Sequence, residues 1–138
     1  MKVPINEPIF VVEGEKDADR LYQLGLTATT NPMGAGYWRN EFNEHLRGRI
    51  VILLPDNDTP GKRHMEAVRQ NLKRIAISVK VITLPGLPEK GDVSDWINNG
   101  GTKHALGQLK LKQPPLEDID FHRNRLKLHR QPARGLVD

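Results

Sequence analysis

The chain contains no cysteine among its 138 residues. Cysteine-based zinc modules and disulfide-stabilised scaffolds are therefore excluded within this sequence. It also contains no apolar stretch long enough to cross a bilayer, and its N-terminus lacks the pattern of a signal peptide. We therefore expect a cytoplasmic protein in a reducing environment, with no membrane partner.

The excess of positive charge is small and unevenly distributed. The net charge is +4, but residues 1–118 carry 16 basic and 15 acidic side chains, whereas residues 119–138 carry 5 and 2. The basic excess thus lies at the C-terminal end of the sequence. A basic tail either contacts phosphates or forms a solvated end of the chain.

Short apolar runs alternate with stretches of helical spacing. The runs that we interpret as strands cover residues 8–12, 26–30, 50–54 and 79–84. The third run is apolar on both faces, as a central parallel strand should be. Helical spacing is found at about residues 15–24, 38–46, 62–75, 93–97 and, after the capping residue Thr102, to about 111.

This alternation predicts an α/β domain with an about four-stranded, mainly parallel sheet flanked by helices. Gln113-Pro114-Pro115 has the composition of a boundary, and the pattern beyond it is poor. We therefore expect one domain over residues 1–111, followed by a proline-containing linker and an irregular basic tail over 112–138.

Three short acidic segments lie in order along the chain, and the first two each follow a predicted strand. Glu13 comes directly after the first strand, Asp56 and Asp58 come after the third, and Asp92 and Asp95 lie at the start of a short predicted helix, beyond a loop over residues 85–91. Because the carboxyl ends of parallel strands share one crevice, we expect these carboxylates to gather there. Carboxylate oxygens are the ligands of hard divalent cations such as Mg²⁺, which in turn indicates chemistry on phosphates.

Each acidic residue also has a purely structural interpretation. Asp56 and Asp58 would point the same way in an extended segment and repel each other without a cation, but they could equally form a turn and a helix cap. Gly61 would give this turn backbone freedom. Glu13 is either a metal ligand or proton-transfer group, or it favours the start of the next helix. Asp17 lies one helical turn further on and could face the same crevice.

Asp92 and Asp95 are three residues apart, so that one could cap the short helix while the other faces the cation. Trp96 is expected in the core. The candidates for contacts to phosphate or nucleotide are three basic side chains and a glycine loop, namely Lys16, Lys62, Arg63, Gly34 and Gly36. The alternatives are local charge balance for the basic residues and an ordinary tight turn for the loop.

Taken together, these motifs resemble the TOPRIM domain of DnaG-type primases, phage primase-helicases, topoisomerases and small nucleases. The resemblance covers about residues 8–100. It is carried by Glu-Gly-Glu-Lys-Asp-Ala from Glu13, by Asp-Asn-Asp-x-x-Gly from Asp56, and by Lys-Gly-Asp-Val-Ser-Asp-Trp from Lys90. The last segment is most similar to primases of phages and mobile elements.

The resemblance implies a role for each matching residue. Glu13 matches the glutamate that acts as general base in nucleotidyl transfer and as general acid in cleavage. Asp56 and Asp58 match the paired aspartates that hold Mg²⁺, for which Mn²⁺ can substitute. Asp92 matches an additional acidic metal ligand, Asp95 is a further acidic candidate, and Gly34 and Gly36 match the glycine-containing loop.

The function implied by this resemblance is Mg²⁺-dependent nucleotidyl transfer in DNA replication, in which an RNA or DNA primer is synthesised. The expected partners are a single-stranded DNA template, nucleoside triphosphates, and a helicase or another replication protein. Two alternatives are a small metal-dependent nuclease with the same acidic residues and a non-catalytic replication module. Primases of this kind carry an upstream zinc-binding module, so we expect this cysteine-free chain to be only part of the enzyme.

Overall fold

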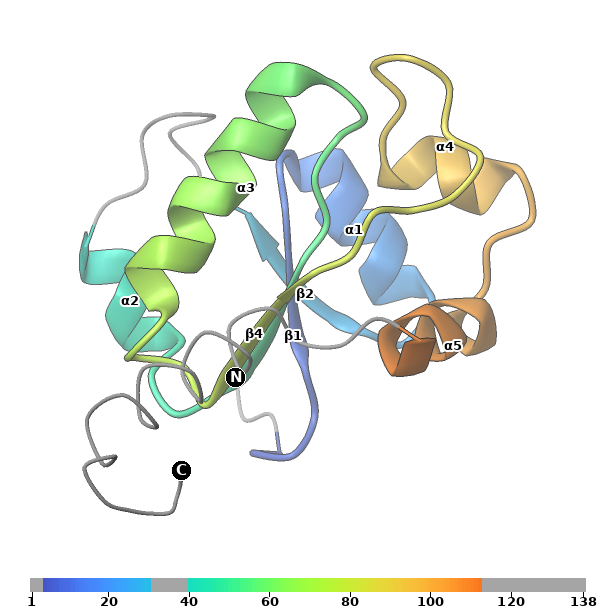
Figure 1. Cartoon of the computed structure of the whole chain (residues 1–138). Helices are drawn as coiled ribbons and strands as arrows, with labels where there is room; N and C mark the ends of the chain where they lie inside the picture. Colours follow the sequence, from blue (N-terminus) through green and yellow to red (C-terminus); the bar gives the residue numbers. More distant parts are fainter. Residues whose placement is uncertain (1–3, 31–39, 113–138) are drawn as a thin grey trace.

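A computed structural model describes residues 4–30 and 40–112 of the chain (Figure 1). Its strands are β1 (Ile9–Val12), β2 (Thr27–Thr30), β3 (Ile50–Leu53) and β4 (Ser78–Val81). Its helices are α1 (Glu15–Gln23), α2 (Asn40–His45), α3 (Thr59–Leu72), α4 (Val93–Asn98) and α5 (Lys103–Lys112). No helix within the described ranges is long and apolar enough to cross a membrane.

The four strands form one sheet in the order β2-β1-β3-β4, and every pair is parallel. The prediction of an α/β fold with a four-stranded, mainly parallel sheet is therefore confirmed. β1 and β3 are the two central strands, with Ile9 opposite Val51 and Val11 opposite Leu53. Their carboxyl ends therefore lie next to each other.

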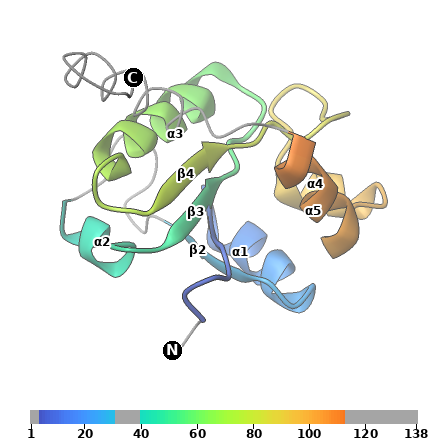
Figure 2. The same cartoon turned by 60° about the horizontal axis from the view of Figure 1, so that its bottom comes forward.

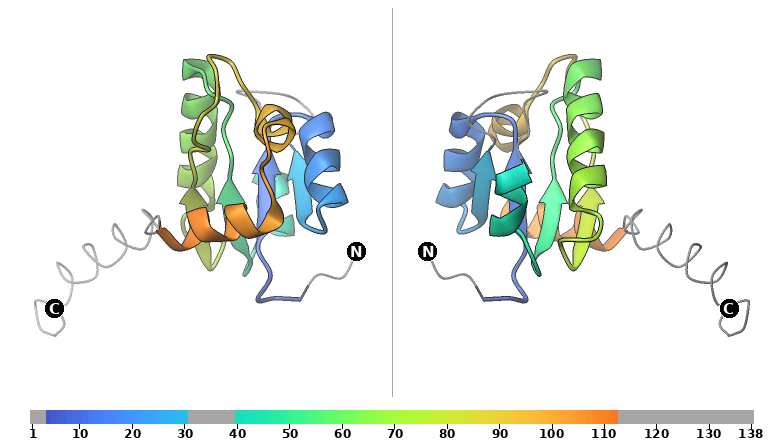
Figure 3. Two further views of the ribbon diagram at one scale, coloured as in Figure 1. Left: turned by 90° about the vertical axis from the view of Figure 1, so that its right-hand side faces the viewer. Right: turned by 90° about the vertical axis from the view of Figure 1, so that its left-hand side faces the viewer.

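Two hydrophobic clusters lie on the two faces of this sheet, because alternate residues of a strand point to opposite faces. Phe10 and Ile52 pack in one cluster together with residues of α1, α4 and α5. Val11 and Leu53 pack in the other cluster together with residues of α3 and with Leu46, which directly follows α2. Figures 2 and 3 show the resulting three layers, with α3 on one side of the sheet and α1 on the other.

The helices follow the sequence prediction closely except at α3, which ends at Leu72 instead of about residue 75. α3 begins at Thr59 rather than at about Lys62, because Asp58 caps it and Pro60 lies in its first turn. Its predicted inner stripe of Met65, Val68 and Leu72 is confirmed, since all three are fully buried.

The later helices agree with their predicted capping. Thr102 caps α5 through its Oγ1, which accepts a hydrogen bond from the Ala105 N–H at 3.1 Å. Trp96 lies in the core, with 8% of its surface exposed, as predicted. The predicted tail from residue 113 onward lies outside the described residues, as do residues 38 and 39 of the predicted second helix.

Candidate active site

Glu13 and Asp56 meet at the carboxyl ends of the two central strands. Pairing of β1 with β3 continues past the strands through a hydrogen bond from the Leu54 N–H to the Val11 carbonyl at 3.0 Å. One step further, the Asp56 N–H donates to Glu13 Oε2 at 2.7 Å. The glutamate of the first acidic motif is thereby fixed against the backbone of the second.

Asp58 lies beside this pair and begins α3. Its Oδ1 accepts a hydrogen bond from the Gly61 N–H at 2.6 Å, which makes it the N-cap of the helix. Its own N–H donates to the Asp56 carbonyl at 2.8 Å. The segment is therefore a tight turn with a helix cap, which agrees with the structural interpretation of the sequence, and the two aspartates do not align along an extended segment.

Gly61 has a different role from the predicted one. Its φ is not among the positive values, so backbone freedom is not what this position needs. A Cβ here would overlap Glu13 Oε2 and would lie 2.8 Å from Asp58 Oδ1 and 3.2 Å from the Asp56 carbonyl oxygen. Glycine is required because two carboxylates approach the helix at this point.

The third acidic motif is tied to the start of α4. Asp92 Oδ1 accepts from the Asp95 N–H at 3.0 Å, and Asp95 Oδ2 accepts from the Asp92 N–H at 3.0 Å, so the two residues form a capping box. Asp92 Oδ2 forms an ion pair with Lys16 Nζ at 3.3 Å. Both aspartates therefore have a capping role, which is the structural interpretation of this pair in the sequence.

Asp17 is buried and links α1 to α4. Its Oδ1 accepts from the Ser94 hydroxyl at 2.6 Å and from the Ser94 N–H at 3.1 Å. Asp17 was a predicted candidate for the crevice, whereas Ser94 was not predicted. The region was indicated only by the segment Lys-Gly-Asp-Val-Ser-Asp-Trp taken as a whole. No local pattern predicts a hydrogen bond between two residues that lie 77 positions apart.

The crevice carries more negative charge than its surroundings neutralise. Burial, together with the charges of Glu13, Asp17, Asp92 and Asp58, raises the pKa of Asp56 to about 7. Burial also raises the pKa values of Glu13 and Asp17, although the hydrogen bonds that each accepts act in the opposite direction. Burial alone would raise the pKa of Asp92, but the Asp95 N–H and Lys16 outweigh it, and the pKa lies below its ordinary value.

The donor set fits a cation in part. Asp56 Oδ1 is buried and has no hydrogen-bond partner. Burial removes the hydrogen bonds of this oxygen to water, and no protein group replaces them. Within residues 4–30 and 40–112, however, no three acidic or histidine side chains are arranged as a ready-made metal site. Asp56 and Glu13, with Asp58 next to them, are the residues that could hold a cation, while Asp92 is engaged by Lys16.

The predicted phosphate-contacting residues lie around this crevice or outside the described residues. Lys16 is exposed at the start of α1 and is paired with Asp92. Lys62 and Arg63 are exposed near the start of α3, which begins at the crevice. Gly34 and Gly36 lie outside the described residues, so their role stays a prediction.

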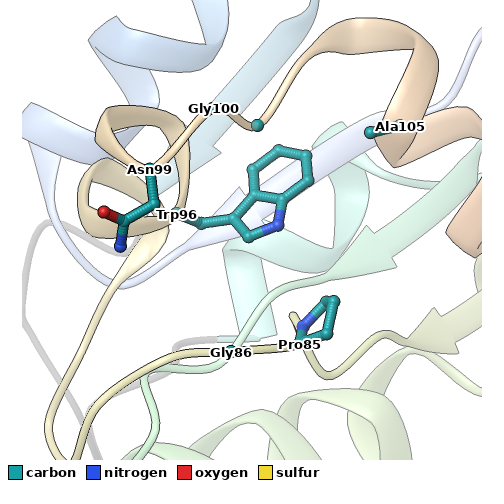
Figure 4. A pocket seen from close by; sticks show the side chains of 7 residues that line it. Pro85, Gly86, Trp96, Asn99, Gly100 and Ala105 are labelled. Atoms are coloured by element: carbon teal, nitrogen blue, oxygen red, sulfur yellow. The ribbon is translucent and has the colours of Figure 1, made fainter.

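A separate pocket of about 280 Å³ lies at the other end of α4. Figure 4 shows the indole of Trp96 between Gly100 and Ala105 on one side and Pro85 and Gly86 on the other. No carboxylate lines this pocket. It is therefore distinct from the acidic crevice at the N-terminal end of the same helix.

No protein-family model matches the chain, and no curated protein matches it. Solved structures do resemble it. The zinc-binding and RNA polymerase domains of the Aquifex aeolicus primase share 23% identity with it at a TM-score of 0.65, over 90% of this chain and 29% of that one. The catalytic domain of a DnaG primase bound to single-stranded DNA shares 21% identity at a TM-score of 0.60, over 87% and 38%.

A third likeness is to a bacteriophage T7 assembly, in which the lagging-strand DNA polymerase interacts with primase domains of two gp4 subunits bound to an RNA/DNA hybrid and dTTP. The identity there is 19%, the TM-score 0.57, and the coverage 80% of this chain and 56% of that one. The chain spans between 29% and 56% of the length of these three structures. At these identities the likeness concerns the fold, and the chain has a primase-like fold.

Proposed function

We propose that this chain is the TOPRIM-type catalytic domain of a primase-like nucleotidyltransferase that acts in DNA replication with Mg²⁺, for which Mn²⁺ can substitute. The observation that carries the proposal is the contact between Glu13 and the backbone of Asp56 at the carboxyl edge of a primase-like fold. Burial is the main cause of the raised pKa values of Glu13 and Asp56, and the charge of Asp58, which lies in the same crevice, contributes to both.

The protein's own residues supply positioning and proton transfer. Glu13 is held through Oε2 by the Asp56 N–H, which leaves Oε1 to take the proton of a primer 3′-hydroxyl. Its raised pKa makes it a better proton acceptor than an ordinary exposed glutamate. Asp56 and Asp58 would hold Mg²⁺, and Asp92 would join them once released from Lys16. The 3′-oxygen would then bond to the α-phosphorus of the nucleoside triphosphate as pyrophosphate leaves, and bound Mg²⁺ would neutralise the charge on these phosphates.

Lys16 would then be free to contact the triphosphate. Its side chain is largely exposed and its ammonium group lies 3.3 Å from an oxygen of Asp92, so exchange of this aspartate for a phosphate oxygen would replace one anionic partner by another. Lys62 and Arg63, exposed beside the crevice, would contact the nucleic acid backbone. We propose single-stranded DNA and nucleoside triphosphates as substrates, since one similar structure is a primase domain bound to single-stranded DNA and another contains dTTP.

The similar primases are much longer than this chain, so we propose that it acts with further domains or with a replication partner such as a helicase. The T7 primase domains, which interact with a DNA polymerase, give one example of such an assembly.

The test is incubation with labelled single-stranded DNA, with and without nucleoside triphosphates, in Mg²⁺ and in chelator. Metal-dependent extension supports the proposal. Metal-dependent cleavage would contradict the proposal and indicate a nuclease. If the protein binds Mg²⁺ but shows no turnover, even in the presence of a helicase, the proposal is also contradicted and an accessory role is indicated.

Two variants connect the outcome to the proposed residues. Asp56→Asn and Asp58→Asn should each abolish the metal-dependent reaction while the circular dichroism spectrum stays unchanged. Asp19→Asn is the matched control, because Asp19 is exposed on α1. Retained activity in both site variants would contradict the assignment.

A further inference from the structure

Asn57, which lies between the two aspartates, is bonded to the loop that leads to Asp92. Its Nδ2 donates to the carbonyl of Leu87 at 3.1 Å and to that of Pro88 at 3.0 Å. Its N–H donates to the Gly91 carbonyl at 2.8 Å, and its own carbonyl accepts from the Lys90 N–H at 2.8 Å. One residue therefore makes four hydrogen bonds to a segment about 30 residues away.

The segment held by Asn57 has a conformation that needs outside support. Lys90 has φ +63, which is unfavourable for a residue with a Cβ. Gly91 has no room for a side chain, since a Cβ would lie 2.8 Å from Pro88 Cδ and 2.9 Å from the Pro88 carbonyl oxygen. Such a backbone persists only where surrounding contacts determine it, and Asn57 provides four of these contacts.

We propose that Asn57 is a positioning residue whose side chain fixes the 87–91 loop and thereby places Asp92 opposite Asp56 and Asp58. Asp92 directly follows the last residue of this loop and caps α4, so a shift of the loop moves its carboxylate. Both loops lie at the same end of the sheet (Figure 1). The consequence for cation binding rests on the proposed function, whereas the hydrogen-bonded clamp itself does not.

The hydrogen bonds at position 57 require asparagine rather than aspartate, the residue on either side of it. The amide offers two N–H donors, and both face backbone carbonyls. An aspartate here would turn an acceptor toward those carbonyls and would add a further negative charge to the crevice. Asn57→Asp, which keeps the shape of the side chain, is therefore expected to loosen the loop more than Asn57→Ala, which removes the amide.

The test begins with hydrogen exchange in the metal-free protein. Asn57→Ala should make the Lys90 N–H exchange about tenfold faster, because two hydrogen bonds that hold the loop closed are lost. Asn57→Asp should accelerate it further. The sheet amides Leu54 and Ile82, which bond to neighbouring strands, should exchange at unchanged rates and thus report that the fold is intact.

Asn71→Ala is the matched control. Asn71 also donates through Nδ2 to a backbone carbonyl, that of Ala67, at 3.0 Å, but on the exposed face of α3. Loss of the same group there should leave exchange at Lys90 unchanged. Unaltered exchange in Asn57→Ala, or an equal change in both variants, would overturn the clamp.

Titration with MgCl₂, followed by NMR, then tests the positioning role. Asn57→Ala should weaken the affinity about tenfold, as expected when a supporting contact of a ligand is removed, and Asn71→Ala should not. Faster Lys90 exchange with unchanged Mg²⁺ affinity would overturn the positioning role and leave the proposed function standing.

If the wild-type protein itself binds no Mg²⁺, the proposed function fails instead. The inference is then decided by the Lys90 exchange together with the backbone chemical shift of Asp92 in the metal-free protein. That shift should change in Asn57→Ala and stay the same in Asn71→Ala, and an unchanged shift in both would overturn the inference.

Discussion

Gly61 offers a sharp test of the site geometry, because replacement by alanine should act against the usual preference of a helix. Gly61 is the third residue of α3. Alanine in a helix is normally more favourable than glycine by about 1 kcal/mol. Here the added Cβ would overlap Glu13 Oε2 and would lie 2.8 Å from Asp58 Oδ1.

The carboxylate of Glu13 can move away only by giving up its hydrogen bond from the Asp56 N–H. A hydrogen bond to a charged group contributes about 1.5–3 kcal/mol. The helix cap by Asp58, typically worth about 1 kcal/mol, is disturbed at the same time. After the gain in helix preference is subtracted, Gly61→Ala should destabilise the protein by about 1–3 kcal/mol.

Gly107→Ala is the matched control, since Gly107 lies within α5 and a Cβ there would meet nothing within 4 Å. This variant should stabilise the protein by about 1 kcal/mol. Urea denaturation of both variants gives the two free energies of unfolding. Metal-dependent activity should be lost only in Gly61→Ala, because only there is Glu13 displaced. Stabilisation of both variants to the same extent would refute the close approach of Glu13 to α3.

Three further predictions concern buried groups. Ser94→Ala removes a 2.6 Å hydrogen bond to buried Asp17 and should lower the free energy of unfolding by about 1–3 kcal/mol, measured by urea denaturation. The pKa of Asp56 is raised from 3.8 to about 7, so ionisation of this group opposes folding. In chelator, the free energy of unfolding of Asp56→Asn should therefore exceed that of the wild type by an amount that grows as the pH rises from 3.8 to about 7. A difference that stays constant over this pH range would contradict the prediction. Gly101→Ala would drive a Cβ into the ring of Trp96 and should cost about 1–3 kcal/mol, with a shift in tryptophan fluorescence.

The fold was predictable because each element carries a local signal. The β3 run Ile50–Leu53 is apolar on both faces, and Met65, Val68 and Leu72 keep the spacing of one helix face. The start of α3 was also present in the sequence as Asp58 followed by Pro60, and a helix cap was one of the two interpretations of this segment, beside a metal-binding turn. A cap and a metal ligand use the same residue types, so the pattern alone does not separate them.

The supporting contacts of the site were not predictable in this way. Asn57 bonds to residues 30 and 31 positions away, and Ser94 bonds to a residue 77 positions away. Such pairs depend on how loops from different strands meet, which periodicity does not describe. Gly61 illustrates the same limit, since its requirement comes from Glu13, a residue of another element.

The carboxylates of the crevice differ in what holds them, and this difference has a consequence for cation binding. Asp92 is stabilised as an anion by a backbone N–H and by Lys16, which keep its pKa below the ordinary value. Asp56 has a buried oxygen without a partner, and its pKa is raised to about 7 by burial and by its acidic neighbours. A cation that binds at Asp56 must therefore displace a proton from a large fraction of the molecules at neutral pH. A cation bound there would also remove the repulsion between Asp56 and Glu13, so the charge that destabilises the metal-free crevice would contribute to the affinity of the proposed site.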